Sequence, residues 1–281
     1  MDRIRPAAVA GSFYPSVAEE LSQLVDDCFK SSPLGPQGAK SPSPTIIGGL
    51  VPHAGYIYSG PCAAHFYARL DHSIQRIILL GVNHQARGHR AALSPAAYWQ
   101  TPLGRVRVDQ ELNHVLQDGV RFLKLDDLAH AEEHSIEVQL PFLQHVLGEF
   151  SFLPISLAHM SVAECAELGA AVADVYRSST QSGIRTIMMA SSDLSHYLSP
   201  KETAESDGIV LEEVLALNPR RLIEVAEREN ITMCGLLPTA VLLFATNVLG
   251  LKQACLLKHC HSGDVTPMRK VVGYASVAFE S

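Results

Sequence analysis

Residues 45–56, TIIGGLVPHAGY, join a short apolar run to a turn of small residues that carries His53. The same order recurs at 76–84, where RIILLG precedes VNH, and at 186–196, where TIMMA precedes SSDLSH. Apolar runs of four to eight residues bounded by turn residues are typical of buried parallel strands, and ligands bind beyond the carboxyl ends of such strands. If the three runs are neighbouring strands, three imidazoles and one carboxylate converge at one edge of the sheet: His53, His84, His196 and Asp193.

The chain of 281 residues is expected to form a single domain, residues 1–281. Strand-like and helix-like segments alternate along it, without an internal repeat or a shift in composition. Hydrophobic residues make up 47% of the chain and charged residues 18%, which is enough apolar material to cover both faces of a sheet. These features predict an α/β domain of three layers around a central, mostly parallel or mixed sheet.

The expected elements alternate after a first helix at 17–30 and a surface loop at 31–44 that is rich in Pro, Ser and Gly. Residues Ser161 and Glu164 form the capping-box pattern of a helix start. Further helices are expected at 61–70, 109–117, 132–147, 161–177, 200–216, 219–229 and 238–248, and further strands at 150–156, 252–258 and 271–279.

Charge and composition exclude several classes of function. The net charge is −7 and no basic stripe is present, which argues against nucleic-acid binding. No apolar stretch reaches the roughly 18 residues of a membrane span, and the N-terminal residues lack the continuous apolar segment of a secretory signal. Six scattered cysteines without a CxxC pair are expected to be reduced thiols. We therefore expect a cytoplasmic protein that binds neither nucleic acid nor membrane.

Each strand-end side chain also has an ordinary structural explanation. His53 could be a buried turn residue bonded to backbone, and His84 could be a turn histidine after Asn83. Asp193 could cap a helix start, or it could bind a metal or orient the imidazole of His196. Independent accidents would not place all of them at strand exits, so a metal or acid–base site is favoured.

Two further segments carry candidate residues. In EEHSIE at 132–137, His134 and Glu137 are three residues apart, so on a helix they would share one face. This spacing suits a metal site or an acid–base pair, and equally an ordinary solvated face. Cys234 precedes an apolar helix, where a thiol can bind a borderline metal, although lone cysteines are more often core residues. The HCH cluster at 259–261 is not expected to share an ion, because on a strand the cysteine points away from both neighbours.

Other catalytic patterns are missing from the sequence. There is no G-x-S-x-G elbow, no G-x-x-x-x-G-K-[ST] loop and no G-x-G-x-x-G turn, so serine-hydrolase chemistry and nucleotide binding have little support. The second histidine of the HExxH zinc-protease motif is also missing after His134.

Motifs along nearly the whole chain resemble the Memo-like family, which includes the B proteins of AmmeMemoRadiSam systems. The matching segments stand in the family's order. They are RPAAVAGSFYP at 5–15, PHAGYIYSG at 52–60, GVNH at 81–84, EHSIEVQLPFL at 133–143, SSDLSHY at 191–197, MCG at 233–235, and SGDVT and VVGYA between 262 and 275.

The resemblance implies a fold similar to that of class III extradiol dioxygenases, which use non-haem Fe(II). It places metal ligands at His53, His84 and Cys234, with Asp193 as a possible fourth. A thiolate in place of the dioxygenases' carboxylate favours soft or redox-active ions and puts ring cleavage in doubt. Fe(II) is the expected metal, with copper or zinc as alternatives. The family also implies radical SAM and AMMECR-type protein partners.

Three functions remain open. The first is a metal-dependent, dioxygenase-like oxidoreductase, in which His196 or His134 transfers protons and Asp193 completes or tunes the metal site. The second is a zinc-type hydrolase, in which His196 or Glu137 accepts a proton from metal-bound water. The third is a non-catalytic protein that binds a metal, a peptide or a partner enzyme.

Overall fold

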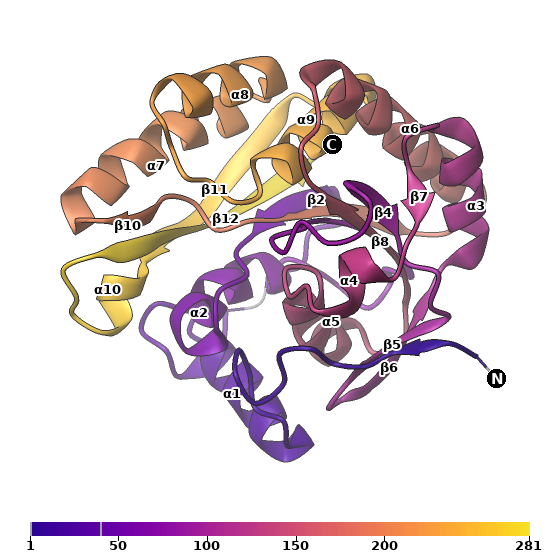
Figure 1. Cartoon of the computed structure of the whole chain (residues 1–281). Helices are drawn as coiled ribbons and strands as arrows, with labels where there is room; N and C mark the ends of the chain where they lie inside the picture. Colours follow the sequence, from indigo (N-terminus) through magenta and orange to yellow (C-terminus); the bar gives the residue numbers. More distant parts are fainter. Residues whose placement is uncertain (1, 40) are drawn as a thin grey trace.

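A mixed sheet of twelve strands, counted over the described residues 2–39 and 41–281, runs through the middle of the molecule (Figure 1). The structure is a computed structural model. Helices pack against both faces of the sheet, and the main path of paired strands is β1-β5-β6-β8-β3-β9-β2-β12-β10. The predicted three-layer α/β fold with a mixed central sheet is confirmed.

The centre of the sheet consists of four parallel strands in the order β8-β3-β9-β2. All residues of β2 (Ile46–Val51), β8 (Ser151–Leu157) and β9 (Thr186–Ser191) are buried, as is all of β3 (Arg76–Val82) after its first residue. Their apolar runs have this character because helices cover both faces. The three runs that end in histidine turns are therefore neighbours, and their carboxyl ends meet at one edge.

Two apolar layers flank the sheet, one on each face. One lies under α1 (Ala18–Lys30), α2 (Tyr56–Tyr67) and α5 (Leu140–Leu147). The other contains residues from helices that cover the opposite face. These are α3 (Gln110–Gly119), α6 (Val162–Gln181), α7 (Pro200–Leu215), α8 (Pro219–Arg228) and α9 (Leu236–Val248).

Antiparallel strands extend the sheet beyond its parallel centre. β12 (Val271–Glu280) pairs with β2, with β11 (Gln253–His261) and with β10 (His196–Leu198), and the short α10 (Ser262–Val265) lies between β11 and β12. Short strands complete the other side of the sheet. They are β1 (Ile4–Arg5), β4 (Ala91–Leu93), β5 (Tyr98–Thr101), β6 (Gly104–Val108) and β7 (Lys124–Leu125).

The expected helix at 132–147 is wrong in its first half. The chain forms α4 (Leu128–Ala131), then a turn, the 3-10 helix η1 (Glu137–Gln139) and α5. In the turn, the carboxylate of Glu133 accepts the backbone N–H groups of His134 and Ser135, which competes with helical hydrogen bonding. The candidate residues of this segment therefore lie on an irregular turn.

The helix expected at 61–70 begins five residues earlier, as α2 (Tyr56–Tyr67), whereas several other boundaries follow the sequence closely. The capping box of Ser161 and Glu164 begins α6 as expected, and a second box begins α7. Residues 31–39 and 41–44 contain no helix or strand, as expected for a loop, and residue 40 lies outside the described residues. Among the described residues, every helix is too short or too polar to cross a membrane.

Candidate metal centre

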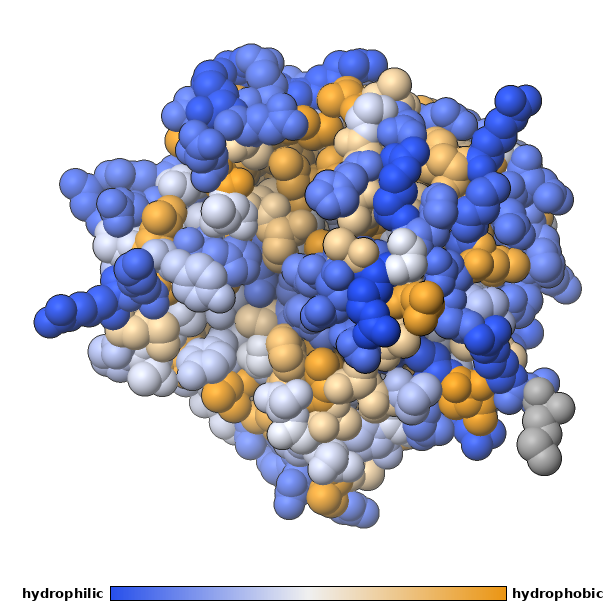
Figure 2. Space-filling view, viewed as in Figure 1, coloured by the Kyte–Doolittle hydropathy of each residue, from blue (hydrophilic) through white to orange (hydrophobic). Residues whose placement is uncertain are grey.

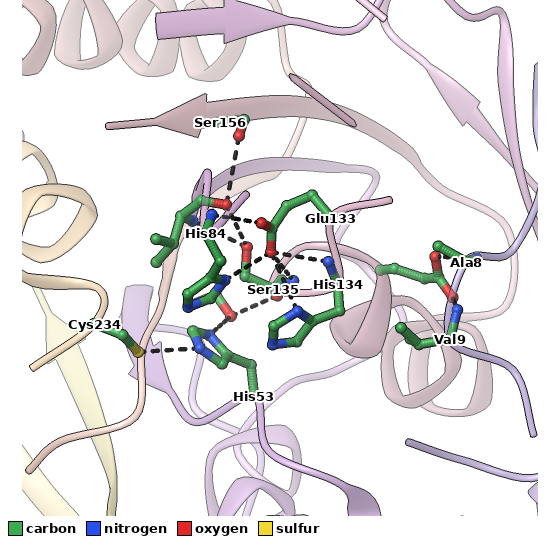
Figure 3. A network of polar contacts seen from close by, with 12 residues as sticks. Ala8, Val9, His53, His84, Glu133, His134, Ser135, Ser156 and Cys234 are labelled. Atoms are coloured by element: carbon green, nitrogen blue, oxygen red, sulfur yellow. Dashed lines mark hydrogen bonds and ion pairs between the residues drawn. The ribbon is translucent and has the colours of Figure 1, made fainter. Parts of the chain in front are cut away.

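Three imidazoles meet at the carboxyl ends of the central strands (Figure 3). His53 follows β2, His84 follows β3, and His134 lies on the turn between α4 and η1. One nitrogen atom from each ring lies within 4.8 Å of the other two. The rings of His84 and His134 stack with centroids 4.6 Å apart, and His53 stands nearly perpendicular to both. His53 is buried, whereas His84 is exposed, so the cluster has an open side.

The loop after β9 fixes the turn that carries His53. One carboxylate oxygen of Asp193, Oδ1, accepts the backbone N–H of His53 at 2.7 Å and that of Ala54 at 3.2 Å. Pro52 has no backbone N–H to continue the ladder of β2, so the strand ends there and the histidine enters the turn. Asp193 thus fixes the backbone of the His53 turn by accepting two hydrogen bonds at Oδ1.

The thiol of Cys234 reaches the same imidazole from the loop before α9. Its Sγ lies 3.1 Å from Nε2 of His53 and 3.6 Å from the carbonyl oxygen of Asp193. A Cβ on the next residue, Gly235, would lie 2.6 Å from the carbonyl oxygen of Ser191. Glycine therefore permits the close approach of backbone that brings the thiol to the end of β9.

Glu133 forms hydrogen bonds to two of the three histidines. It was not among the residues predicted for the site. Its Oε1 accepts hydrogen bonds from Nδ1 of His84 at 2.9 Å and from the backbone N–H groups of His134 and Ser135, both at 2.8 Å. Its Oε2 accepts the backbone N–H of His84 at 2.6 Å. Burial alone would raise the pKa of Glu133, but these bonds and the neighbouring imidazoles lower it to about 2. In the sequence, only its place beside a candidate histidine marked it.

Ser191, at the end of β9, contacts the ring of the third histidine, His53. Its hydroxyl lies 3.0 Å from Nδ1 of His53, and it also contacts Gln139 and the carbonyl of Ser135. Glu133 and Ser191 thus both face Nδ1 atoms, and Nε2 of His53 faces the Cys234 thiol instead.

Comparison with known proteins assigns the chain to a family. A family model described as Memo-like protein matches residues 5–278. The chain belongs to the Memo-like family. It is 40% identical over 282 residues to a MEMO1 family protein of Methanopyrus kandleri, and the match covers 98% of both chains. It is 38% identical to a MEMO1 family protein of Pyrobaculum arsenaticum over 99% of both chains. A Thermotoga neapolitana relative is 39% identical, over 97% of this chain and 98% of its own.

In this Memo-like protein, the oxygens of Glu137 bind groups other than the imidazoles, and only its charge acts on His134 among the described residues of the cluster. It is fully buried and forms an ion pair with Arg5. It also accepts the hydroxyl of Tyr14 and the backbone N–H groups of Ala8 and Val9. Figure 3 shows Ala8 and Val9 to one side of the cluster. Glu137 therefore anchors the N-terminal segment, which was predicted as part of the family motif but not as part of the site.

The anchored N-terminal segment forms one wall of the cluster. The ring of Phe13 lies 4.5 Å from that of His134, measured between centroids, and the carbonyl of Phe13 accepts the backbone N–H of Tyr56 at the start of α2. The face of the molecule seen in Figure 2 is hollowed near its centre, where apolar side chains come into view among polar ones.

His196 lies outside the group of three imidazoles. Its Nδ1 is 2.8 Å from the carbonyl oxygen of Thr232, and its backbone N–H donates to the Thr232 hydroxyl. Its ring is near enough to His53 for its charge to contribute to the lowered pKa of that imidazole. His196 is half-buried, so it belongs to the surroundings of the cluster.

Burial controls the charge states of the cluster. It lowers the pKa of His53 well below the ordinary value, assisted by the charges of His134 and His84. Burial also lowers the pKa of His134 to about 4 and raises that of Asp193 to about 6. The pKa of the Cys234 thiol is raised, first by burial and then by the charge of Asp193. His53 and His134 are therefore neutral near pH 7, which is the form of imidazole that binds a metal.

The residues present fit a transition-metal ion. Neutral imidazole nitrogens and a cysteine sulfur are ligands that zinc, copper and iron accept. The Nδ1 atoms of two of the rings are occupied by hydrogen bonds, as is usual for histidines that bind a metal through Nε2. The donor set is thus suited to a transition metal.

Proposed function

We propose that this chain is a metal-dependent oxidoreductase whose non-haem ion is held by His53, His84 and Cys234, with His134 as a further donor. The convergence of one nitrogen atom from each of the three rings within 4.8 Å supports this function, as does the Cys234 sulfur 3.1 Å from Nε2 of His53. The exposed position of His84 leaves a side from which a small substrate can approach.

Iron(II) is the metal we propose first, with copper as the next choice. Imidazole suits both ions, and a thiolate beside imidazoles favours ions that change oxidation state. The two-histidine, one-carboxylate arrangement of dioxygenases would need a carboxylate ligand, and Asp193 directs one oxygen to the backbone of the His53 turn. A dioxygenase-like redox reaction therefore fits the donor set better than ring cleavage by a carboxylate-bound ion.

A bound metal would exchange electrons with a substrate or with oxygen. Side chains of the protein would carry out proton transfer. His196 is the first candidate for proton transfer. Its Nδ1 faces the carbonyl of Thr232, which can only accept, so Nδ1 carries the proton and Nε2 is free. His134 is the second, since its low pKa leaves it neutral at pH 7 and able to accept a proton. Glu137 has no part, because Arg5, Tyr14 and two backbone amides occupy its oxygens.

Metal content tests the metal-binding part of this proposal. Protein purified without chelators should contain close to one equivalent of iron or copper by elemental analysis, and a His53→Ala/His84→Ala variant should lose it. A His72→Ala/His114→Ala variant is the matched control, because both of these histidines are exposed and lie outside the cluster. Full metal content in the first variant would refute the assignment of the two histidines.

A zinc-type hydrolase is the second candidate. Three imidazoles around one position form the ligand set of some catalytic zinc sites, in which the metal lowers the pKa of a bound water. The two functions differ in their need for oxygen and for a redox-active ion. Turnover of a hydrolysable substrate by zinc-loaded protein under anaerobic conditions would favour the hydrolase, and strict dependence on oxygen would exclude it.

Partnership with radical SAM and AMMECR-type proteins stays a prediction from the resemblance.

A further inference from the structure

The hydroxyl of Ser191 has three polar neighbours, and their chemistry fixes the position of its single proton. Its Oγ lies 2.6 Å from the carbonyl oxygen of Ser135, 2.8 Å from Nε2 of Gln139 and 3.0 Å from Nδ1 of His53. A carbonyl can only accept, so the contact with Ser135 requires the serine to donate its proton there. The other two neighbours must then donate to the serine oxygen.

The orientation of the Gln139 amide agrees with this assignment. Its Nε2 also donates to the carbonyl oxygen of Pro52 at 2.9 Å, and its Oε1 accepts the hydroxyl of Tyr67. An amide flipped by 180° would place an oxygen against the Pro52 carbonyl, so the nitrogen must face Ser191. The Ser191 oxygen therefore accepts from Gln139 on one side and from Nδ1–H of His53 on the other.

The second ring is oriented by a different group with the same result. Both oxygens of Glu133 face backbone N–H donors, and Oε1 also faces Nδ1 of His84 at 2.9 Å. An oxygen that already accepts two backbone N–H groups acts as an acceptor toward the ring as well. His84 is therefore also protonated at Nδ1.

We propose that Ser191 and Glu133 are positioning residues that fix His53 and His84 as their Nδ1–H tautomers before any metal binds. A free imidazole in water exchanges between two tautomers, and only the Nδ1–H form presents the Nε2 electron pair. In this form both Nε2 atoms carry an electron pair, and that of His53 faces the Cys234 thiol at 3.1 Å. The inference rests on the proposed function only in calling these rings metal ligands, because the tautomers are a property of the metal-free chain.

Nuclear magnetic resonance of the metal-free protein tests this inference directly. The chain is labelled with nitrogen-15 in its histidines, freed of metal and recorded at roughly pH 8, above the ordinary pKa of imidazole. Long-range proton–nitrogen spectra distinguish Nδ1–H from Nε2–H rings. The His53 and His84 signals are assigned by their absence in His53→Gln and His84→Gln variants. In the wild-type chain, both rings should be protonated at Nδ1 alone.

Ser191→Ala should release only one ring. His53 should then show Nε2–H or a mixture of tautomers, while His84 keeps its pattern. Ser156→Ala is the matched control, because Ser156 is a fully buried serine whose hydroxyl donates to the carbonyl oxygens of Val82 and Ala129, and both rings should stay unchanged. The backbone amide spectrum shows whether each variant is folded.

Two outcomes would overturn the inference. One is an Nε2–H ring at either position in the wild-type chain, which decides the matter even if Ser191→Ala fails to fold. The other is a folded Ser191→Ala variant in which His53 keeps its wild-type pattern. A wild-type chain with both Nδ1–H tautomers that binds no metal would instead refute the proposed function alone.

Discussion

Cys234 follows His53 by 181 residues in the chain, yet its Sγ lies 3.1 Å from Nε2 of that imidazole. The contact joins the loop before α9 to the turn after β2, and this loop is held at the sheet edge where the N–H of Gly235 donates to the hydroxyl of Ser192 after β9. The thiol faces one nitrogen of a ring whose other nitrogen is held by Ser191, which is the geometry that our proposal of a shared metal ion requires.

Replacing the thiol should change the metal site and leave the fold intact. In Cys234→Ser, we expect cobalt(II) affinity to fall by roughly tenfold or more, and the sulfur-to-cobalt absorption in the near ultraviolet to disappear. Titration with cobalt(II) under absorbance spectroscopy measures both. Cys255→Ser serves as the control, because this half-buried thiol contacts only a backbone carbonyl and lies at the far end of β11. An unchanged absorption band in Cys234→Ser would show that the sulfur is no ligand.

Removing the charge of Glu133 should weaken metal binding without removing a ligand. Glu133→Gln replaces one accepting oxygen by an amide nitrogen, so at least one of its N–H donors loses its acceptor. Changes in such supporting groups typically reduce metal affinity by about 10- to 100-fold. Isothermal titration of the metal-free variant with zinc measures this loss. Affinity within twofold of the wild-type value would show that the carboxylate does not support the ligands.

The same residue predicts a loss of stability in acid. The pKa of Glu133 is lowered to about 2 in the folded chain, so its contribution is complete above the unfolded-state pKa near 4.5 and is lost as the pH falls toward 2. The contribution is about 3 kcal/mol at most. Urea unfolding of the wild-type chain and Glu133→Gln at several pH values should show a difference in unfolding free energy that shrinks across this range. A difference that stays constant down to pH 2 would contradict the assignment.

Glu137→Gln should lower stability strongly and change metal affinity little. It leaves Arg5 buried without its ionised partner, and breaking a buried ion pair typically costs about 3–5 kcal/mol. Because Glu137 accepts its hydrogen bonds from Arg5, Tyr14 and backbone amides and from none of the three imidazoles in the described part of the chain, we expect metal affinity to change by no more than about twofold, well below the 10- to 100-fold typical of supporting groups. Urea unfolding and zinc titration on the same sample measure both properties. A large loss of metal affinity at wild-type stability would show that Glu137 supports metal binding.

His130 should make the chain sensitive to mild acid. It is buried beside Trp99, and burial, followed by the nearby charge of Arg5, lowers its pKa to about 3. The unfolded chain takes up a proton near pH 6.5 and the folded chain does not, so stability falls as the pH drops from 6.5 toward 3. In His130→Leu, the unfolding free energy should depend less steeply on pH over that range. An unchanged slope would show that other groups cause the acid sensitivity.

The sequence predicts the centre of the fold well and its margins poorly. The runs before His53, His84 and Asp193 are buried on both faces, so their apolar character alone reveals β2, β3 and β9. The short strands β4 to β7 have two to five residues each, too few for a periodic pattern to stand out. The turn at 132–136 depends on bonds from one carboxylate, which no periodicity records.

The candidate site was predictable to the same extent. The approach of His53 and His84 follows from neighbouring strands with a common direction. Cys234 could be placed beside them only through the family resemblance, because its position depends on how α9 packs. Glu133 and Ser191 gave no distinct signal, since a glutamate or a serine near a histidine is common and only the three-dimensional contacts give it a role.

The N-terminal segment bears on the order in which the site is completed during synthesis. Ala8 and Val9 emerge from the ribosome early, but the carboxylate that anchors them belongs to Glu137, 129 residues after Ala8. The wall that Phe13 provides must therefore wait for the middle of the chain, and the thiol of Cys234 arrives later still. His53 therefore gains its sulfur neighbour only when the last fifth of the chain is being made, so the surroundings of the cluster are completed late in synthesis.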